Sequence, residues 1–162
     1  MLLANPSQKQ RGRQQPPTTE DCLAKSEPSL AGFSLLLGLK PSSAEPIAHH
    51  TILFPENYDL EFEAIFSSKT PVEKPTIYIC APHDPLMVKD ANHEAWFVLV
   101  NAPRHSTAGD GYDWSDEDFN YRYAQEIISQ IESAGIPIRE RLELLEIRTP
   151  LDLQESVNAP GE

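Results

Sequence analysis

The sequence is poor in cysteine, and this shortage excludes several kinds of site. Its 162 residues include only two cysteines, Cys22 and Cys80. Two cysteines do not make a disulfide framework, and neither lies in the Cys-x-x-Cys spacing that is typical of metal-binding pairs. Cys22 belongs to a polar leader and Cys80 to an apolar run that is typical of a buried strand. These positions fit a reducing compartment.

Basic residues and long apolar runs are also scarce. Thirteen Lys and Arg stand against 25 Asp and Glu, and the resulting net charge of -12 would repel phosphate backbones. We therefore expect no nucleic-acid partner. No apolar run approaches the ~20 residues of a membrane-spanning helix, and residues 1–15 lack the apolar core of a signal peptide. The chain is expected to be cytoplasmic, or peripheral to a membrane.

The motifs of nucleotide-binding proteins and hydrolases are missing as well. Gly109-Asp110-Gly111 begins like a dinucleotide fingerprint, but its third glycine would have to stand at position 114, which is Trp114. A P-loop, a Gly-x-Ser-x-Gly elbow and a His-Glu-x-x-His pair are absent from the sequence. The acids between positions 110 and 118 are interpreted as a solvated loop and a helix start. The sequence thus predicts no catalytic and no cofactor-binding residue.

Five histidines raise the hypothesis of a metal site. Adjacent His49 and His50 would point to opposite faces of a strand, so we do not expect them to share an ion. His83, Asp84 and His93 lie in loops, where the sequence does not define the geometry of a ligand set. We therefore predict no metal site and interpret one of His49 and His50 as a hydrogen-bonded neighbour of the sheet.

The strongest pattern that is present is a pair of apolar runs, residues 75–82 and 95–103, each closed by Ala-Pro. Their β-branched and aromatic residues predict two adjacent antiparallel strands in the middle of a sheet. Alternation places one set of side chains on one face, Ile77, Ile79, Trp96, Val98 and Val100, and a second set on the other, Tyr78, Cys80, Phe97 and Leu99. Because neither face is polar, helices should cover one face, and a missing domain or an apolar ligand the other.

Further strands are predicted over residues 33–39, 49–54 and 142–147, and helices over 57–66, 115–134 and 150–157. In the first helix we expect Tyr58, Phe62, Ile65 and Phe66 to form the apolar stripe, with Asp59, Glu61 and Glu63 outside. In the second, Ser115 is the expected cap, Trp114 the hydrophobic staple before it, and Gly135 the end. The fold class is α+β: a mostly antiparallel mixed sheet with helices on one face. Residues 1–27 are expected to be a mobile or loosely packed leader, and residues 28–162 the domain.

Several short motifs occur in a specific order between about Pro28 and the end of the chain. They are Pro28-Ser29-Leu30-Ala31-Gly32-Phe33, His49-His50-Thr51-Ile52-Leu53-Phe54, Tyr58-x-x-x-Phe62-x-x-Ile65-Phe66, Pro75-Thr76-Ile77-Tyr78, Asp84-Pro85, Phe97-Val98-Leu99-Val100-Asn101-Ala102-Pro103, Thr149-Pro150 and Asn158-Ala159-Pro160-Gly161. Their order and spacing resemble the bacterial-type phytoene desaturases, FAD-dependent carotenoid desaturases of the flavin amine-oxidase-like superfamily. The resemblance implies that this region is similar to the substrate-binding domain of that superfamily.

The resemblance also implies FAD in the full-length proteins, an apolar polyene substrate and peripheral membrane association. Family members are much longer: they open with a Gly-rich dinucleotide-binding turn and close with a further FAD-contacting segment, and neither matches this chain. We therefore expect this chain alone to hold no FAD. The loop over residues 82–96 looks shorter than in the family, so no substrate contact is assigned to it. The residues expected to line the polyene channel are His50, Tyr78, Phe97 and Leu99.

Three functions are compatible with these observations. The first is a part of an FAD-dependent carotenoid desaturase that positions the polyene. The second is a non-enzymatic module that binds isoprenoids or other lipids in the same apolar groove. The third is an inactive truncated product, whose uncovered sheet face would promote self-association.

Overall fold

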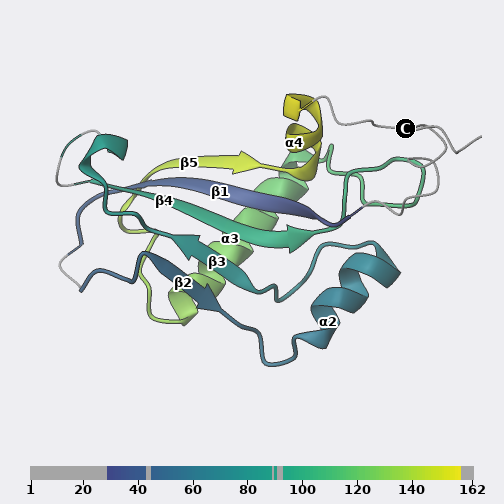
Figure 1. Ribbon diagram of the computed structural model, residues 1–162, viewed down its shortest axis with the longest axis horizontal. Coiled ribbons are helices and arrows are strands. Elements are labelled where there is room, and N and C mark those ends of the chain that lie inside the picture. The colour runs from purple at the N-terminus through teal and green to yellow at the C-terminus, as the bar shows by residue number, and fades with distance from the viewer. Residues whose placement is uncertain (1–28, 43–44, 89, 91–92, 158–162) are drawn as a thin grey trace, which may run out of the picture.

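The protein is described by a computed structural model that covers residues 29–42, 45–88, 90 and 93–157 (Figure 1). The predicted leader over residues 1–27, with Cys22, and the motif Asn158-Ala159-Pro160-Gly161 lie outside these residues. The α+β class is confirmed. The strands are β1 (Ala31–Leu39), β2 (His50–Leu53), β3 (Ile77–Cys80), β4 (Glu94–Ala102) and β5 (Leu142–Arg148). The helices are α2 (Asp59–Phe62), the π-helix η1 (Glu63–Ser68), the 3-10 helix η2 (Pro85–Met87), α3 (Glu117–Ser133) and α4 (Pro150–Val157).

The strands form one sheet with the order β2-β3-β4-β1-β5, and its four ladders are all antiparallel. The predicted pairing of the two central apolar runs is confirmed, since Ile77 lies opposite Val100 and Ile79 opposite Val98. The nine-residue strands β1 and β4 pair along their whole length, from Ala31 with Ala102 to Leu39 with Glu94. β4 is therefore the middle strand.

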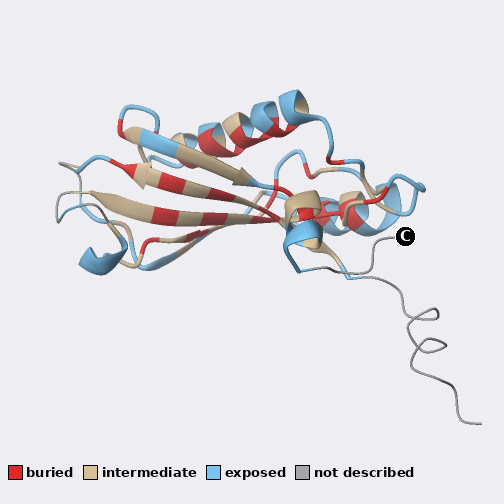
Figure 2. Cartoon of the chain, turned by 90° about the horizontal axis from the view of Figure 1, so that it is seen from above, coloured by how far each residue is buried: buried red, intermediate tan, exposed pale blue. Residues whose placement is uncertain are grey.

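Helix α3 covers one face of this sheet. Figure 1 shows α3 behind the strands, and Figure 2 shows it running along a single face. Its buried side chains, Tyr123, Ala124, Ile127, Ile128 and Ile131, share one hydrophobic core with Phe33, Leu35, Leu37, Ile77, Ile79, Trp96, Val98 and Val100. Burial of each large apolar side chain contributes about 1.5–3 kcal/mol. The helix stripe and the strand alternation in the sequence thus combine into the core.

The start of α3 differs from the prediction. Asp116 caps the helix, and its Oδ1 accepts a hydrogen bond from the Phe119 N–H at 3.0 Å. The prediction of Ser115 as the cap is wrong, because the Asp113 carboxylate binds the Ser115 N–H at 3.0 Å and thereby places Asp116 at the helix entry. Trp114 packs against Phe119 in the first turn, with the ring centroids 6.2 Å apart. With Asp116 as the cap, Trp114 lies two residues before it, so this contact is not the predicted hydrophobic staple, which joins the residue directly before the cap to the fourth helical residue.

Helix α4 begins as the sequence predicted. The Thr149 N–H donates to Asp152 Oδ2 at 2.7 Å, and the Asp152 N–H donates back to Thr149 Oγ1 at 3.2 Å. Pro150 occupies the first helical position, where its missing N–H is not needed. In Figure 1, α4 and α2 both lie near the same end of the sheet.

Helix α2 is turned the opposite way from the prediction. Glu61 was expected outside but is 1% exposed, and its carboxylate accepts hydrogen bonds from the Thr76 N–H and from Asn101 Nδ2, both at 2.8 Å. Of the expected apolar stripe only Ile65 is buried, whereas Tyr58, Phe62 and Phe66 are exposed. A buried carboxylate is tolerated when it has hydrogen-bond partners, and both partners lie far along the chain. The local periodicity could not reveal them.

We expect Glu61→Ala to lower the free energy of unfolding by about 2–6 kcal/mol, since two donors would each lose their partner at about 1–3 kcal/mol. Urea denaturation followed by circular dichroism measures this loss. Glu63→Ala is the matched control, because Glu63 is exposed on the adjoining turn and its replacement should change stability by less than about 0.5 kcal/mol. Equal stability of the two variants would show that Glu61 does not anchor α2.

Candidate functional site

The face of the sheet turned away from α3 is apolar and largely uncovered, and we call it the open face. Its apolar side chains are Leu36, Ile52, Phe97, Leu99 and Leu144, together with the ring of Tyr78. Ile52 exposes 50% and Leu144 57% of its surface. Figure 1 looks onto this face, and in the described part of the chain no helix runs along it as α3 runs along the other. As expected, a helix covers one face of the sheet and, in the described residues, no helix covers the other.

The four residues predicted to line a polyene channel all lie on this surface. Tyr78 pairs with Leu99 across β3 and β4, and Cys80 pairs with Phe97 two residues further along. His50 lies opposite Cys80 on the edge strand β2, with its Nδ1 2.8 Å from Tyr78 Oη. Their common location agrees with the predicted alternation. Their role in substrate binding stays a prediction.

A groove of about 420 Å³ crosses the open face between the sheet and η2. Phe97 and Cys80 line it, whereas His50, Tyr78 and Leu99 lie outside it. Sequence reasoning missed most of its other apolar lining, which comes from three segments: Leu36 and Gly38 of β1, Met87 and Val88 at η2, and Leu144 of β5. The run in β1 is apolar throughout, so its alternation gave no sign of which side chains face the groove.

Two glycines make room for leucines on the open face. A Cβ at Gly38 would lie 3.0 Å from Leu144 Cβ, and a Cβ at Gly32 would lie 2.7 Å from Leu99 Cδ1. Because these positions carry no side chain, Leu144 and Leu99 can lie over the neighbouring strand β1. Leu144 thereby lines the groove, and Leu99 extends the apolar surface beyond it.

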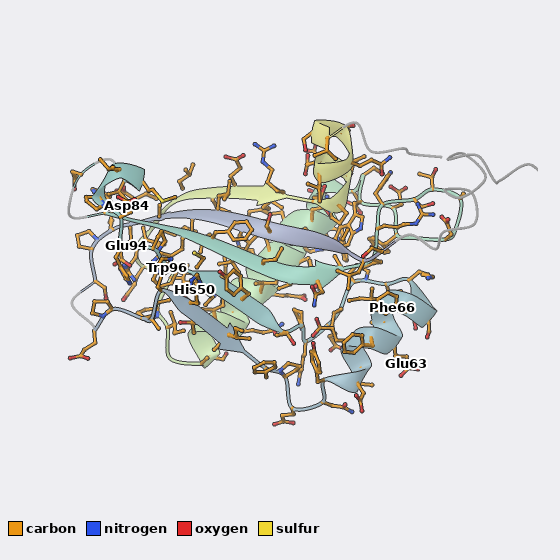
Figure 3. The ribbon with its side chains drawn as sticks, viewed as in Figure 1. His50, Glu63, Phe66, Asp84, Glu94 and Trp96 are labelled. Atoms are coloured by element: carbon orange, nitrogen blue, oxygen red, sulfur yellow. The ribbon has the colours of Figure 1, made fainter. Side chains whose placement is uncertain are left out.

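The polar groups of the open face carry little net charge. Desolvation and the neighbouring Cys80 thiol raise the pKa of the Tyr78 phenol, so it stays neutral at physiological pH. At the rim, Glu94 forms an ion pair with Arg141 and accepts a hydrogen bond from Trp96 Nε1 at 2.8 Å. Figure 3 labels Glu94 and Trp96 at this end of the sheet, away from Phe66 on η1. Such a surface suits a neutral, apolar ligand.

The loop over residues 109–111 and the start of α3 do not fit the pyrophosphate of FAD. A Cβ at Gly111 would lie 2.5 Å from the Arg104 carbonyl oxygen, so this glycine serves close packing of the loop on itself. An anion at a helix N-terminus needs free N–H groups, but here the Asp116 carboxylate occupies one of them. Glu117 and Asp118 add further negative charge to the first turn.

The prediction that His49 and His50 point apart is wrong. Their rings stack with centroids 4.2 Å apart. His49 lies in a bend before β2 begins at His50, so strand alternation does not apply to it. Ligand atoms of both histidines and of Cys80 lie within 4.8 Å of one another.

None of the helices in the described residues combines the length and the apolar character needed to cross a bilayer. No protein-family model matches the chain.

Curated relatives are found among enzymes that act on carotenoids. The chain is 33% identical over 142 residues to the 1-hydroxycarotenoid 3,4-desaturase of Flavobacterium sp. (strain P99-3), an alignment that covers 83% of this chain and 27% of the relative. It is 32% identical over 134 residues to the phytoene desaturase (lycopene-forming) of Paracoccus sp. (strain N81106 / MBIC 01143), an alignment that covers 81% of this chain and 26% of the relative. It is 27% identical over 115 residues to the carotenoid 3,4-desaturase of Haloarcula japonica, an alignment that covers 69% of this chain and 21% of the relative. The chain thus spans about a quarter of the length of these relatives.

Proposed function

Since this chain belongs to the bacterial-type carotenoid desaturases, we propose that it is part of an FAD-dependent oxidoreductase that desaturates a carotenoid precursor such as phytoene. The role that we propose for the described residues is to bind and orient the polyene. The single observation that carries this role is the apolar groove of about 420 Å³ on the open face. A groove lined by apolar side chains with few polar groups is typical of sites for small apolar ligands.

The open face offers a polyene three things. Its leucine and aromatic side chains are partly exposed, and covering them gains about 25 cal/mol for each Å² of apolar surface. The acids at the rim are paired, Glu94 with Arg141 and Glu143 with His93 and Lys40, so a neutral chain meets no uncompensated charge there. The phenol of Tyr78 and the ring of Phe97 provide flat surfaces for a conjugated chain.

The chemistry of desaturation would belong to the flavin, whose pyrophosphate the loop over residues 109–111 does not fit. We propose that FAD is held elsewhere in the full-length enzyme, and that this enzyme associates peripherally with the membrane in which its substrate dissolves. The exposed aromatic rings of Phe62 and Phe66 support such an association.

The second candidate is a non-enzymatic module that binds isoprenoids or other lipids in the same groove. It is favoured by the poor fit of the described helix start to a pyrophosphate. The coding DNA on both sides of this sequence separates the two functions. A dinucleotide fingerprint upstream and an FAD-contacting segment downstream would establish the desaturase.

The proposal is tested by gel filtration of the purified chain after incubation with FAD and with lycopene in detergent. We expect carotenoid absorbance to elute with wild-type protein and flavin absorbance to elute separately. Phe97→Ser should reduce the bound carotenoid, whereas Leu60→Ser, an exposed leucine on α2, should not. Failure of the wild-type chain to carry lycopene would contradict polyene binding. Co-elution of flavin would contradict the expectation that this chain alone holds none.

A further inference from the structure

Two imidazoles and a thiol meet where the edge strand β2 pairs with β3. His50 lies directly opposite Cys80 in the antiparallel ladder, and His49 stacks on His50 from the bend that precedes the strand. One ligand atom from each of the three residues lies within 4.8 Å of the other two. Cys80 is a free thiol and also lines the groove, so the cluster can be reached from solvent.

These three side chains form a ligand set that prefers some metal ions over others. A thiolate combined with imidazoles favours zinc(II) or copper(I) over hard cations such as magnesium or calcium. Zinc bonds of roughly 2.0–2.1 Å to nitrogen and 2.3 Å to sulfur imply ligand atoms roughly 3.3–3.6 Å apart in a tetrahedral site. The cluster would need to close by about 1 Å, which exposed histidine side chains can do by rotating about χ1 and χ2.

The surroundings orient one of the ligands. His50 Nδ1 already lies 2.8 Å from the Tyr78 hydroxyl, so Nε2 is the nitrogen offered to an ion. Histidines that bind metals usually make such a hydrogen bond through their other nitrogen, which fixes the ring and its tautomer. The net charge of -12 further raises the local concentration of cations.

The three other histidines each have a hydrogen-bond or ion-pair partner within the domain. His83 Nε2 lies 3.0 Å from the Ile47 carbonyl oxygen, and His93 bridges Asp90 and Glu143. His105 Nδ1 accepts a hydrogen bond from the Trp114 N–H at 3.2 Å. Only the His49 and His50 pair, among the described histidines, converges with a thiol.

We propose that His49, His50 and Cys80 form a binding site for a zinc(II) ion, with a fourth position open to water, and that Tyr78 positions His50. The site shares Cys80 with the groove, and its binding of zinc does not depend on the proposed binding of a polyene.

The test is isothermal titration of zinc(II) into the reduced full chain without a histidine tag, with cobalt(II) absorption as a second readout. We expect one ion per chain and a cobalt spectrum with a charge-transfer band from thiolate. Cys80→Ser and His49→Asn should each weaken zinc binding about tenfold or more, and Cys80→Ser should abolish the thiolate band. Tyr78→Phe should weaken binding by about 10–100-fold, the usual effect of losing an outer hydrogen-bond partner.

Cys22→Ser and His83→Gln are the matched controls. Cys22 lies outside the described residues, and His83 Nε2 lies 3.0 Å from the Ile47 carbonyl oxygen and is not one of the three clustered ligands. Both should bind zinc like the wild type. His49 is exposed, so His49→Asn tests the site even if Cys80→Ser fails to fold. No saturable binding to the wild-type chain would overturn the proposal, and so would equal affinities of the wild type, Cys80→Ser and His49→Asn.

Discussion

Replacing Phe97 and Leu99 together with serine is expected to preserve the fold while reducing self-association of the chain. Both side chains lie on the open face and are only half-buried. Each large apolar side chain left in water forgoes roughly 1.5–3 kcal/mol of burial, which association or detergent binding would recover. The double variant should therefore have a higher monomer fraction in sedimentation velocity and bind less detergent, with an unchanged circular dichroism spectrum.

Val98→Ser with Val100→Ser is the matched control, because these residues alternate with Phe97 and Leu99 along β4. They point toward α3 and are each 1% exposed. Loss of core contacts and burial of hydroxyl groups should cost about 2–4 kcal/mol at each site, a large share of the 5–15 kcal/mol typical of a domain. We expect this variant to unfold. A folded control together with an unfolded open-face variant would show that the two faces are assigned the wrong way round.

Trp114→Ala is expected to give the largest loss of stability of any single tryptophan change, about 3–5 kcal/mol. Trp114 is 1% exposed, and its indole N–H donates to the Pro103 carbonyl at 3.0 Å. Its ring packs among four others, Phe33, Tyr112, Phe119 and Tyr123, with centroids 4.9 to 6.2 Å away. The substitution would open a cavity that these rigid rings cannot fill.

Trp96→Ala should be less damaging, although Trp96 is also buried at 4% exposure. The Arg141 guanidinium lies 5.5 Å from the Trp96 ring centroid, whereas Trp114 packs among four aromatic rings. Urea denaturation of both variants and of Trp114→Phe measures the difference. The free energy of unfolding of Trp114→Phe should lie between those of Trp114→Ala and the wild type. Equal losses of unfolding free energy for Trp114→Ala and Trp96→Ala would contradict the expected difference.

The sequence was most informative where a pattern depends on neighbouring residues. Alternation in residues 77–80 and 94–102 correctly separated Val98 from Phe97, and the stripe ending before Gly135 located α3. The Thr149-Pro150 signal located α4 because its hydrogen bonds join residues three positions apart. Each of these features is determined by local geometry.

Prediction failed where partners are distant in the chain or where regular structure stops. Glu61 is buried by hydrogen bonds to Thr76 and Asn101, 15 and 40 residues away. The groove also depends on β1 lying beside β4 and on β5 lying beside β1, so Leu36 and Leu144 could not be assigned to it. His49 was misplaced because strand alternation was extended one residue beyond the start of β2.

The most direct test of polyene binding on the open face is a methyl NMR titration of the chain with lycopene in detergent. The methyl signals of Leu36 and Leu99 should shift with saturation, because both side chains lie on the open face. Those of Leu35, Val98 and Val100 should stay in place, because they are buried toward α3. Shifts confined to the methyl signals of Leu35, Val98 and Val100 would contradict binding of the polyene on this face. The same would follow if the spectrum with lycopene in detergent were identical to the spectrum with detergent alone.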